Sequence, residues 1–412
     1  MDDTDCVIAG GGPAGVMLGL LLARAGVRVV VCEKHADFLR DFRGDTVHPS
    51  TMRLLDELGL GARFAALPQS RIEQIAFPTP GGGRIVVGDL RRLRTPHPYI
   101  AMVPQWDLLN LLTDAAAAEP TFDLRMSTEV TGLLRDGDRV TGVRYRSADG
   151  GTGDIQAALT VGCDGRWSTV RRAAGLHPRE LPVPIDAWWF RLPRHDSDDL
   201  TGLAPAAGRG AFMVVIGRES HLQIAYVARK GTDAQLRARG VEAFRHEVAA
   251  IAPWLADRVD SVSAMDDVKH LDVRVNRLRR WQLDGLLCIG DAAHAMSPVG
   301  GVGINLAIAD AVATATRLAD PLRRRGRVTT TELAGVQARR ALPTVVVQAM
   351  QQALHRNLVR PILDGRRAGP PAPVLTLMRR LPQASLLPAY LIGIGPRPED
   401  APDFARRPPA PT

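Results

Sequence analysis

Cysteine and long apolar runs are scarce in this sequence of 412 residues. The four cysteines, at positions 6, 32, 163 and 288, form no C-x-x-C pair, and each falls within or at the end of a predicted strand. They are expected to be buried apolar residues, so neither a metal site nor a disulfide framework is predicted. No apolar run approaches 18 residues, and the first residues, MDDTD, contain no basic segment. We therefore predict a cytoplasmic protein without a transmembrane helix.

Lysine is rare too, since Lys34, Lys230 and Lys269 are the only three. The net charge of +8 comes almost entirely from arginine, which is scattered along the chain rather than clustered. This charge is interpreted as a bias of composition, and no nucleic-acid partner is predicted.

Residues 5–34 have the order of elements that binds dinucleotides. A short apolar run precedes the pattern G-x-G-x-x-G at 10–15, helical apolar spacing follows over 16–24, and a second buried strand covers 27–32. The pattern predicts a Rossmann-like unit of strand, helix and strand.

Each glycine of this pattern has its own physical task. Gly10 suits a tight turn, Gly12 allows the backbone to approach a pyrophosphate, and Gly15 allows the helix to pack closely on the strand. Pro13 and Ala14 lie in the first helical turn, whose free N–H groups would face the phosphates.

Glu33 follows the second strand, 18 residues after Gly15. A carboxylate there can accept hydrogen bonds from ribose hydroxyls and favours a free 2′-OH over a 2′-phosphate. These residues predict a dinucleotide, and they leave open whether it is FAD or NAD.

Two later motifs follow buried strands. In VGCDGRWSTVR, at 161–171, a strand ends at Asp164-Gly165. In CIGDAAHAMSPVGGVGIN, at 288–305, a strand ends at Gly290-Asp291 and a glycine-rich loop leads into a helix. The acids can accept hydrogen bonds from ligand hydroxyls, and the helix start offers N–H donors and a positive dipole to an anionic ring.

The remaining pattern predicts an α/β protein with a discontinuous nucleotide-binding domain. Short β runs at 187–192, 211–216 and 221–228 indicate an inserted, mainly antiparallel sheet, with a helix near 233–250. The predicted boundaries are 1–70, 100–180 and 286–325 for the nucleotide-binding domain, 71–99 and 181–285 for the substrate domain, 326–395 for a C-terminal helical segment, and 396–412 for a flexible tail.

Taken together, the three motifs resemble those of the FAD-dependent aromatic hydroxylases, the single-component group A flavoprotein monooxygenases related to para-hydroxybenzoate hydroxylase. The resemblance spans about residues 5–325. Arg43, in FRGDTVHPSTMRLL, matches the arginine after the first βαβ unit of that family, and Gln105 lies where the family often has Gln or Arg near the flavin.

The resemblance implies a role for each motif. Glu33 would hold the adenosine ribose, Asp164 would lie where FAD and the nicotinamide approach, and Asp291 would bind the ribityl or phosphate region. Pro298 and the following glycine turn would lie beside the isoalloxazine ring. The cofactor-binding residues expected on this basis are Gly10, Gly12, Pro13, Ala14, Gly15, Glu33, Lys34, Arg43, Gln105, Asp164, Gly165, Gly290, Asp291, Pro298, Gly301, Val302, Gly303, Ile304 and Asn305.

The residues expected at the reacting atoms are Arg43, Pro298 and Gly300, whereas His294 is expected to be structural. The implied reaction reduces FAD with NADH or NADPH and hydroxylates an aromatic substrate with O₂ through a flavin C4a-hydroperoxide. No second G-x-G-x-x-G follows a strand, so the reductant is expected to bind transiently. A reductase of an alkene or prenyl chain and a non-catalytic flavin-binding protein remain alternatives, and a monomer or homodimer is expected. A halogenase is disfavoured because W-x-W-x-I-P is absent.

The aromatic substrate is expected between the flavin loop and the inserted sheet. Its candidate wall residues are Trp188, Phe190, Phe212, Met213 and Tyr226.

Overall fold

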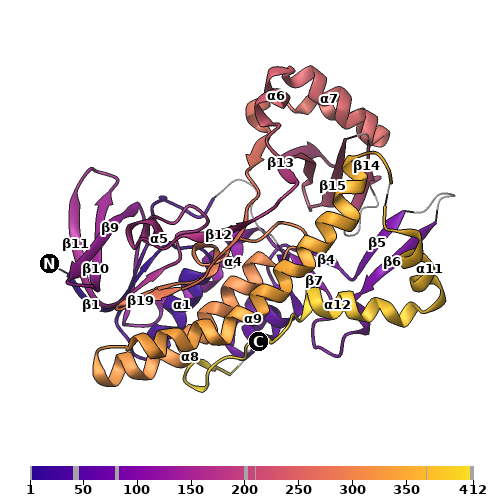
Figure 1. Ribbon diagram of the computed structural model, residues 1–412. Helices are drawn as coiled ribbons and strands as arrows, with labels where there is room; N and C mark the ends of the chain where they lie inside the picture. The colour runs from indigo at the N-terminus through magenta and orange to yellow at the C-terminus, as the bar shows by residue number, and fades with distance from the viewer. Residues whose placement is uncertain are drawn as a thin grey trace.

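A computed structural model describes residues 2–39, 46–78, 83–198, 203–208, 210–367 and 369–408. It consists of a nucleotide-binding domain, an antiparallel substrate domain and a C-terminal helical segment that contacts both (Figure 1). The predicted α/β fold class is therefore confirmed. In the described part of the chain, no helix is both long and apolar enough to cross a membrane.

The first domain is built on an eight-stranded sheet with the order β19-β20-β11-β1-β2-β8, in which β10 pairs with β11 and β9. Its parallel strands are β1 (Asp2–Ala9), β2 (Val29–Cys32), β8 (Phe122–Arg125), β11 (Thr152–Gly162) and β20 (Leu286–Cys288). Its antiparallel strands are β9 (Thr128–Asp136), β10 (Arg139–Ser147) and β19 (Gln282–Leu283). β2 and β20 are buried along their whole length, as expected for parallel strands covered on both faces.

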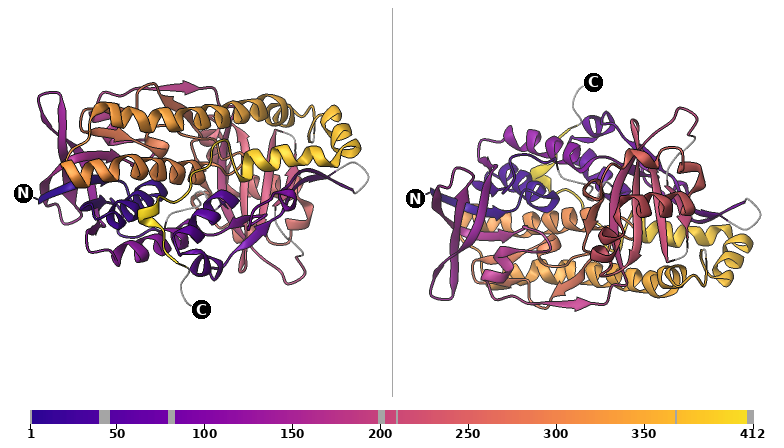
Figure 2. Two further views of the ribbon diagram at one scale, coloured as in Figure 1. Left: turned by 90° about the horizontal axis from the view of Figure 1, so that it is seen from below. Right: turned by 90° about the horizontal axis from the view of Figure 1, so that it is seen from above.

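Helix α1 (Pro13–Arg24) is the central helix of this domain. It contacts α4 (Gln105–Ala117) and α8 (Gly303–Arg325) as well as the sheet, so residues 14–23 are all buried. Because every side of α1 is covered, its sequence is apolar all round rather than striped. α9 (Thr330–Leu354) begins at a capping box of Thr329 and Glu332 and runs beside α8 (Figure 2).

The substrate domain is a five-stranded antiparallel sheet with the order β14-β15-β16-β13-β17. Its strands are β13 (Ile185–Pro193), β14 (Leu203–Ala207), β15 (Ala211–Gly217), β16 (His221–Arg229) and β17 (Lys269–Leu271). Two helices, α6 (Asp233–Ala238) and α7 (Gly240–Ile251), cover its outer face (Figure 1). One helix was predicted over 233–250, but Gly240 adopts φ +81° and divides it.

Smaller elements connect the domains. β3 (Thr46–Val47), β7 (Ile100–Met102) and β4 (Ser70–Ile72) form one sheet, β5 (Gln74–Pro78) pairs with β6 (Arg84–Asp89), and β12 (Pro178–Leu181) pairs with β18 (Val275–Leu278). The short helices of the first domain are α2 (Pro49–Glu57), α3 (Gly61–Ala65) and α5 (Thr169–Ala173).

The C-terminal segment continues from α9 through a π-helical turn (His355–Val359) into α10 (Arg360–Leu363), α11 (Ala372–Arg380) and α12 (Leu386–Gly393). The predicted flexible tail is wrong for residues 396–408, which pack on α9 and on the first domain. Glu399 pairs with Arg340 at 2.9 Å, the Ala401 N–H donates to Glu57 at 2.7 Å, and Ala405 is fully buried. The proline-rich composition of this segment suggested flexibility. Its ordering contacts could not be predicted because their partners lie far away in the sequence.

Candidate active site

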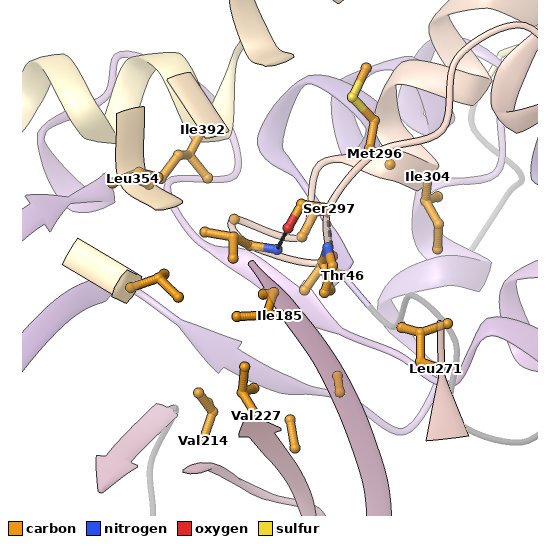
Figure 3. Close-up of a pocket in the computed structure, with 18 of the residues that line it drawn as sticks. Thr46, Ile185, Val214, Val227, Leu271, Met296, Ser297, Ile304, Leu354 and Ile392 are labelled. Atoms are coloured by element: carbon orange, nitrogen blue, oxygen red, sulfur yellow. Dashed lines mark hydrogen bonds between the residues drawn. The ribbon is translucent and has the colours of Figure 1, made fainter. Parts of the chain in front are cut away.

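A cavity of about 2450 Å³ extends from the glycine turn of the first domain to the inner face of the antiparallel sheet. Ordinary small-ligand pockets hold roughly 300–1,000 Å³, so this cavity has room for a dinucleotide and a second molecule. Side chains from both domains and from the C-terminal helices surround the same space, among them Thr46, Ile185, Ser297, Leu354 and Ile392 (Figure 3).

The glycine turn has the geometry that a dinucleotide requires. Gly10 adopts φ +102°, and a Cβ atom added there would lie 2.5 Å from the Cys163 carbonyl oxygen. A Cβ at Gly15 would lie 2.0 Å from the Gly10 carbonyl oxygen, so Gly15 permits the close packing of α1 on the turn. A Cβ at Gly12 would meet no described atom within 4 Å, although Gly12 lines the cavity. The open space at Gly12 lies at the start of α1 and fits a pyrophosphate.

Glu33 closes the turn from the end of β2. It is 3% exposed, its Oε2 accepts a hydrogen bond from the Gly11 N–H at 2.8 Å, and its Oε1 accepts one from the His35 N–H at 3.0 Å. Glu33 therefore holds the glycine turn as well as lining the cavity beside Lys34. Its contact with a ribose stays a prediction.

Asp164 lies at the carboxyl end of β11 and lines the cavity. Its Oδ2 accepts hydrogen bonds from the N–H groups of Thr169 at 2.7 Å and Val170 at 3.0 Å. Its Oδ1 is buried and has no partner among the described residues, and burial raises the pKa of the carboxyl group. A buried acceptor without a partner is costly, and a ligand hydroxyl would satisfy it.

The rest of this motif joins the separate pieces of the site. Ser168 accepts a hydrogen bond from the Arg171 N–H at 2.9 Å and so caps α5. The buried Arg171 guanidinium donates to the carbonyl oxygens of Ala292 at 3.0 Å and Arg166 at 2.7 Å. Arg171 thus ties the second motif to the third and acts through the backbone rather than on a ligand.

Asp291 and Glu33 lie on opposite sides of the glycine turn. Arg166 approaches Asp291, with its Nη2 atom 3.7 Å from Oδ2 of the carboxylate. Both side chains line the cavity. Arg166 belongs to the second motif but was not predicted as a site residue. The signal was its position two residues after Asp164, in the turn that leaves β11.

The loop before α8 is held open by two glycines. Gly300 and Gly301 adopt φ +87° and +62°, and the Thr46 hydroxyl donates to the Gly301 carbonyl oxygen at 2.6 Å. As at the start of any helix, the N–H groups of 303–305 have no carbonyl partner within α8. The first turn of α8 also has no acidic residue and no side-chain cap that would satisfy them. This positive helix end is suited to a ring that gains negative charge on reduction.

Asn305 braces this loop with its side chain. Its Oδ1 accepts hydrogen bonds from the His48 N–H at 2.9 Å and the Thr51 hydroxyl at 2.7 Å, and its Nδ2 donates to the Thr46 carbonyl oxygen at 3.2 Å. The side chain of Asn305 therefore holds the loop from behind and does not line the cavity.

His294 lies away from the cavity, as expected for a structural residue. It is 1% exposed, and its Nε2 lies 2.6 Å from Oδ2 of Asp310. Asp310 also receives Arg340 Nε at 3.0 Å, and Arg340 in turn pairs with Glu399. His294 therefore belongs to a buried network between α8 and α9.

The structure brings most of the predicted cofactor residues to one cavity wall. Those that line it are Gly10, Gly12, Pro13, Ala14, Glu33, Lys34, Gln105, Asp164, Gly165, Asp291, Pro298, Gly301, Gly303 and Ile304, and Gly300, predicted at the reacting atoms, lines it too. Those placed behind the wall are Gly15, Gly290, Val302 and Asn305. Arg43 lies outside the described residues.

The predicted substrate wall needs correction. Phe212 lines the cavity, but Trp188, Phe190, Met213 and Tyr226 point to the other face of the sheet and pack beneath α6 and α7. Side chains alternate along a strand, so neighbours of these residues form the wall instead. The residues that line the cavity are Ile185, Ala187 and Trp189 on β13, Phe212, Val214 and Ile216 on β15, and Gln223, Ala225 and Val227 on β16.

The polar ends of two corrected residues explain their placement. Trp188 Nε1 donates to Asp233 at 2.7 Å, and the Tyr226 hydroxyl donates to Glu247 at 2.5 Å. Both acceptors belong to the helices on the outer face, so these aromatic rings are core residues with satisfied polar atoms. Sequence reasoning also missed the C-terminal helices as part of the wall, which Leu354 and Ile392 represent in Figure 3.

A glycine turn, three strand-end carboxylates, a helix N-terminus and an apolar chamber on one cavity define a flavoprotein that encloses a cofactor together with an apolar ligand. Comparison with known proteins agrees. A family model described as "FAD binding domain" matches residues 3–349. The chain therefore belongs to this family of FAD-dependent monooxygenases, the aromatic hydroxylases, and its cofactor is FAD.

Individual relatives support this assignment. The chain is 37% identical over 339 residues to a 6-methylpretetramide 4-monooxygenase of Streptomyces rimosus, covering 78% of this chain and 77% of the relative. It is 33% identical to a 12-dehydrotetracycline 5-monooxygenase/anhydrotetracycline 6-monooxygenase of Streptomyces rimosus subsp. rimosus, covering 75% of this chain and 61% of that longer protein. The solved structure of the anhydrotetracycline hydroxylase OxyS from Streptomyces rimosus superposes with a TM-score of 0.75 and 25% identity, covering 95% of this chain and 76% of that one.

Proposed function

We propose that this protein hydroxylates a fused-ring aromatic substrate of the polyketide type, using FAD, O₂ and NADH or NADPH. The observation that carries the proposal is the continuity of the cavity, in which a large apolar chamber opens onto the loop Pro298–Gly303. The relatives named for 6-methylpretetramide and anhydrotetracycline support a substrate of this size and class.

Bound FAD would accept electrons from the nicotinamide and activate O₂. The residues of this chain would bind and orient both partners. The glycine turn would hold the pyrophosphate, Asp164 and Asp291 would accept hydrogen bonds from sugar-chain hydroxyls, and the first turn of α8 would stabilise negative charge on the ring.

The walls of the chamber have a separate task. Trp189, Phe212 and Val214 line the same cavity as the flavin loop, together with apolar side chains of the C-terminal helices. They would stack against a flat aromatic substrate and exclude water from the reacting atoms.

The test is a panel of phenols and polycyclic aromatic polyketides, incubated with purified protein, each reductant and ¹⁸O₂, and scored by mass spectrometry. We expect one ¹⁸O atom in a polycyclic product. Protein that carries no FAD and cannot be reconstituted with it would refute the proposal. Anaerobic reduction of an alkene, without oxygen incorporation, would favour the reductase alternative.

Asp291→Ala offers a more local test. Removing this carboxylate from the cavity wall should raise the FAD dissociation constant by roughly 10- to 100-fold, since a hydrogen bond to a charged group contributes roughly 1.5–3 kcal/mol. Fluorescence of released FAD measures the effect, and unchanged affinity would contradict the role given to Asp291. A cytoplasmic location and a monomeric or homodimeric state stay predictions.

A further inference from the structure

The buried face of α9 carries a stripe of polar side chains where an apolar stripe is usual. Its members share a spacing of three or four residues and exposures of 0–2%, and they are Arg340, Thr344, Gln348 and Gln351 on α9 and His355 at the start of the π-helical turn that continues it. A polar stripe buried under a helix is costly unless each group has a partner, so its partners indicate its purpose.

Gln351 is directed at the segment that leads into the flavin loop. Its Oε1 accepts a hydrogen bond from the Ser297 N–H at 3.1 Å, and its Nε2 donates to the carbonyl oxygens of Ser297 at 2.8 Å and Val299 at 2.9 Å. One amide group therefore satisfies three backbone groups on either side of Pro298.

The neighbours of Gln351 on the stripe extend this grip. Gln348 Nε2 donates to the carbonyl oxygens of Asn276 at 2.8 Å and Ala295 at 3.2 Å. His355 Nε2 lies 2.9 Å from the Ser297 hydroxyl oxygen, which also accepts from the Val299 N–H at 3.3 Å. Burial lowers the pKa of His355 to about 4, so this pair is a neutral hydrogen bond near pH 7.

The segment held in this way has no regular secondary structure of its own. Residues 294–297 form neither helix nor strand, yet Ala295, Met296 and Ser297 are buried. Ser297 lines the cavity, while Gln351 lies behind it and does not. β18 reaches only the start of this segment, where the Asn276 N–H donates to the Ala295 carbonyl oxygen at 3.2 Å, and the side chain of Gln351 satisfies the backbone groups that follow, from Ser297 onward.

We propose that Gln351, supported by the Ser297–His355 pair, is a positioning residue that sets the loop Pro298–Gly301 against the flavin ring. Residues 351 and 355 lie beyond the part of the chain that matches the family model, 3–349, so the C-terminal segment contributes to the geometry of the cofactor site. The inference rests on the proposed function only in that FAD occupies the cavity.

The experiment compares Gln351→Met with Gln352→Met in the FAD-loaded protein. Methionine keeps the length and volume of glutamine and removes its polar atoms. Gln352 is the matched control because it is the next residue of α9 and donates instead to Pro182, at 2.9 Å, away from the flavin loop. Three readouts need no aromatic substrate, and they are the FAD dissociation constant, the visible absorption spectrum of bound FAD, and the fraction of NAD(P)H electrons recovered as H₂O₂.

We expect Gln351→Met to raise the FAD dissociation constant about tenfold, the effect of leaving backbone groups unpaired. It should also shift the flavin spectrum, while Gln352→Met matches the wild type. Ser297→Ala should shift the spectrum in the same direction, and Ser297→Thr, which keeps the hydroxyl, should restore it.

A folded Gln351→Met protein with the affinity and spectrum of the control would overturn the proposal. Should that variant fail to fold, Ser297→Ala decides instead, and a spectrum identical to the wild type would count equally against it. A wild-type protein that binds no FAD would refute the proposed function itself, which separates the two failures.

Discussion

Replacing Gly12 by alanine separates cofactor binding from folding. Gly12 precedes α1 with φ −77° and ψ −177°, a conformation that alanine adopts without strain. A Cβ there meets no described atom within 4 Å. The space it would enter is the part of the cavity assigned to the pyrophosphate.

The expected change in stability is small because two effects oppose each other. Losing a glycine reduces the entropy of the unfolded chain and stabilises the fold by about 0.4–1 kcal/mol. Alanine is a poorer N-cap than glycine, which costs up to about 1 kcal/mol. The free energy of unfolding of the FAD-free protein should therefore change by less than about 1 kcal/mol.

FAD binding should respond very differently. A methyl group between the turn and the phosphates blocks the close approach of the backbone, so the dissociation constant should rise by on the order of 100-fold, equivalent to roughly 2.7 kcal/mol. Fluorescence titration of the FAD-free protein measures this change, and urea unfolding of the same sample measures stability.

Gly15→Ala is the matched comparison. Its Cβ would lie 2.0 Å from the Gly10 carbonyl oxygen, so it should destabilise the protein by about 1–3 kcal/mol even without FAD. Gly12→Ala protein that binds FAD as tightly as the wild type would refute the placement of the pyrophosphate.

Two further predictions concern the substrate sheet and the buried histidines. Trp188→Phe loses the hydrogen bond to Asp233, so it should lower the free energy of unfolding by about 1–3 kcal/mol and leave the substrate KM unchanged. Trp189→Phe, on the cavity side, should change the substrate KM with little loss of stability. The reverse result would contradict the assignment of strand faces. Burial lowers the pKa of His48 to about 4, so the unfolded chain binds more protons between pH 6.5 and 4, and the free energy of unfolding should fall over that range by at most ~1.4 kcal/mol per pH unit for this residue. Urea unfolding at pH 7 and pH 5 should show a weaker dependence for His48→Asn, and an equal dependence would exclude His48 as a source.

The sequence by itself determined the cofactor half of this protein. The glycine turn, Glu33, Asp164 and Asp291 each follow a buried strand directly, and strand ends of one parallel sheet meet at one edge. Short-range spacing therefore carried enough information to predict the fold class and a dinucleotide site at this edge, whereas the resemblance of the three motifs to a known family specified FAD.

Only the tertiary structure decided the substrate half. Alternation along β13 shows that Trp188 and Trp189 face opposite sides, but both sides are apolar, and only the packing of α6 and α7 shows which side is sealed core. The docking of residues 396–408 and the polar stripe ending at Gln351 and His355 have the same origin. Their partners lie tens to hundreds of residues away, so no local pattern records the contacts that hold the flavin loop in place.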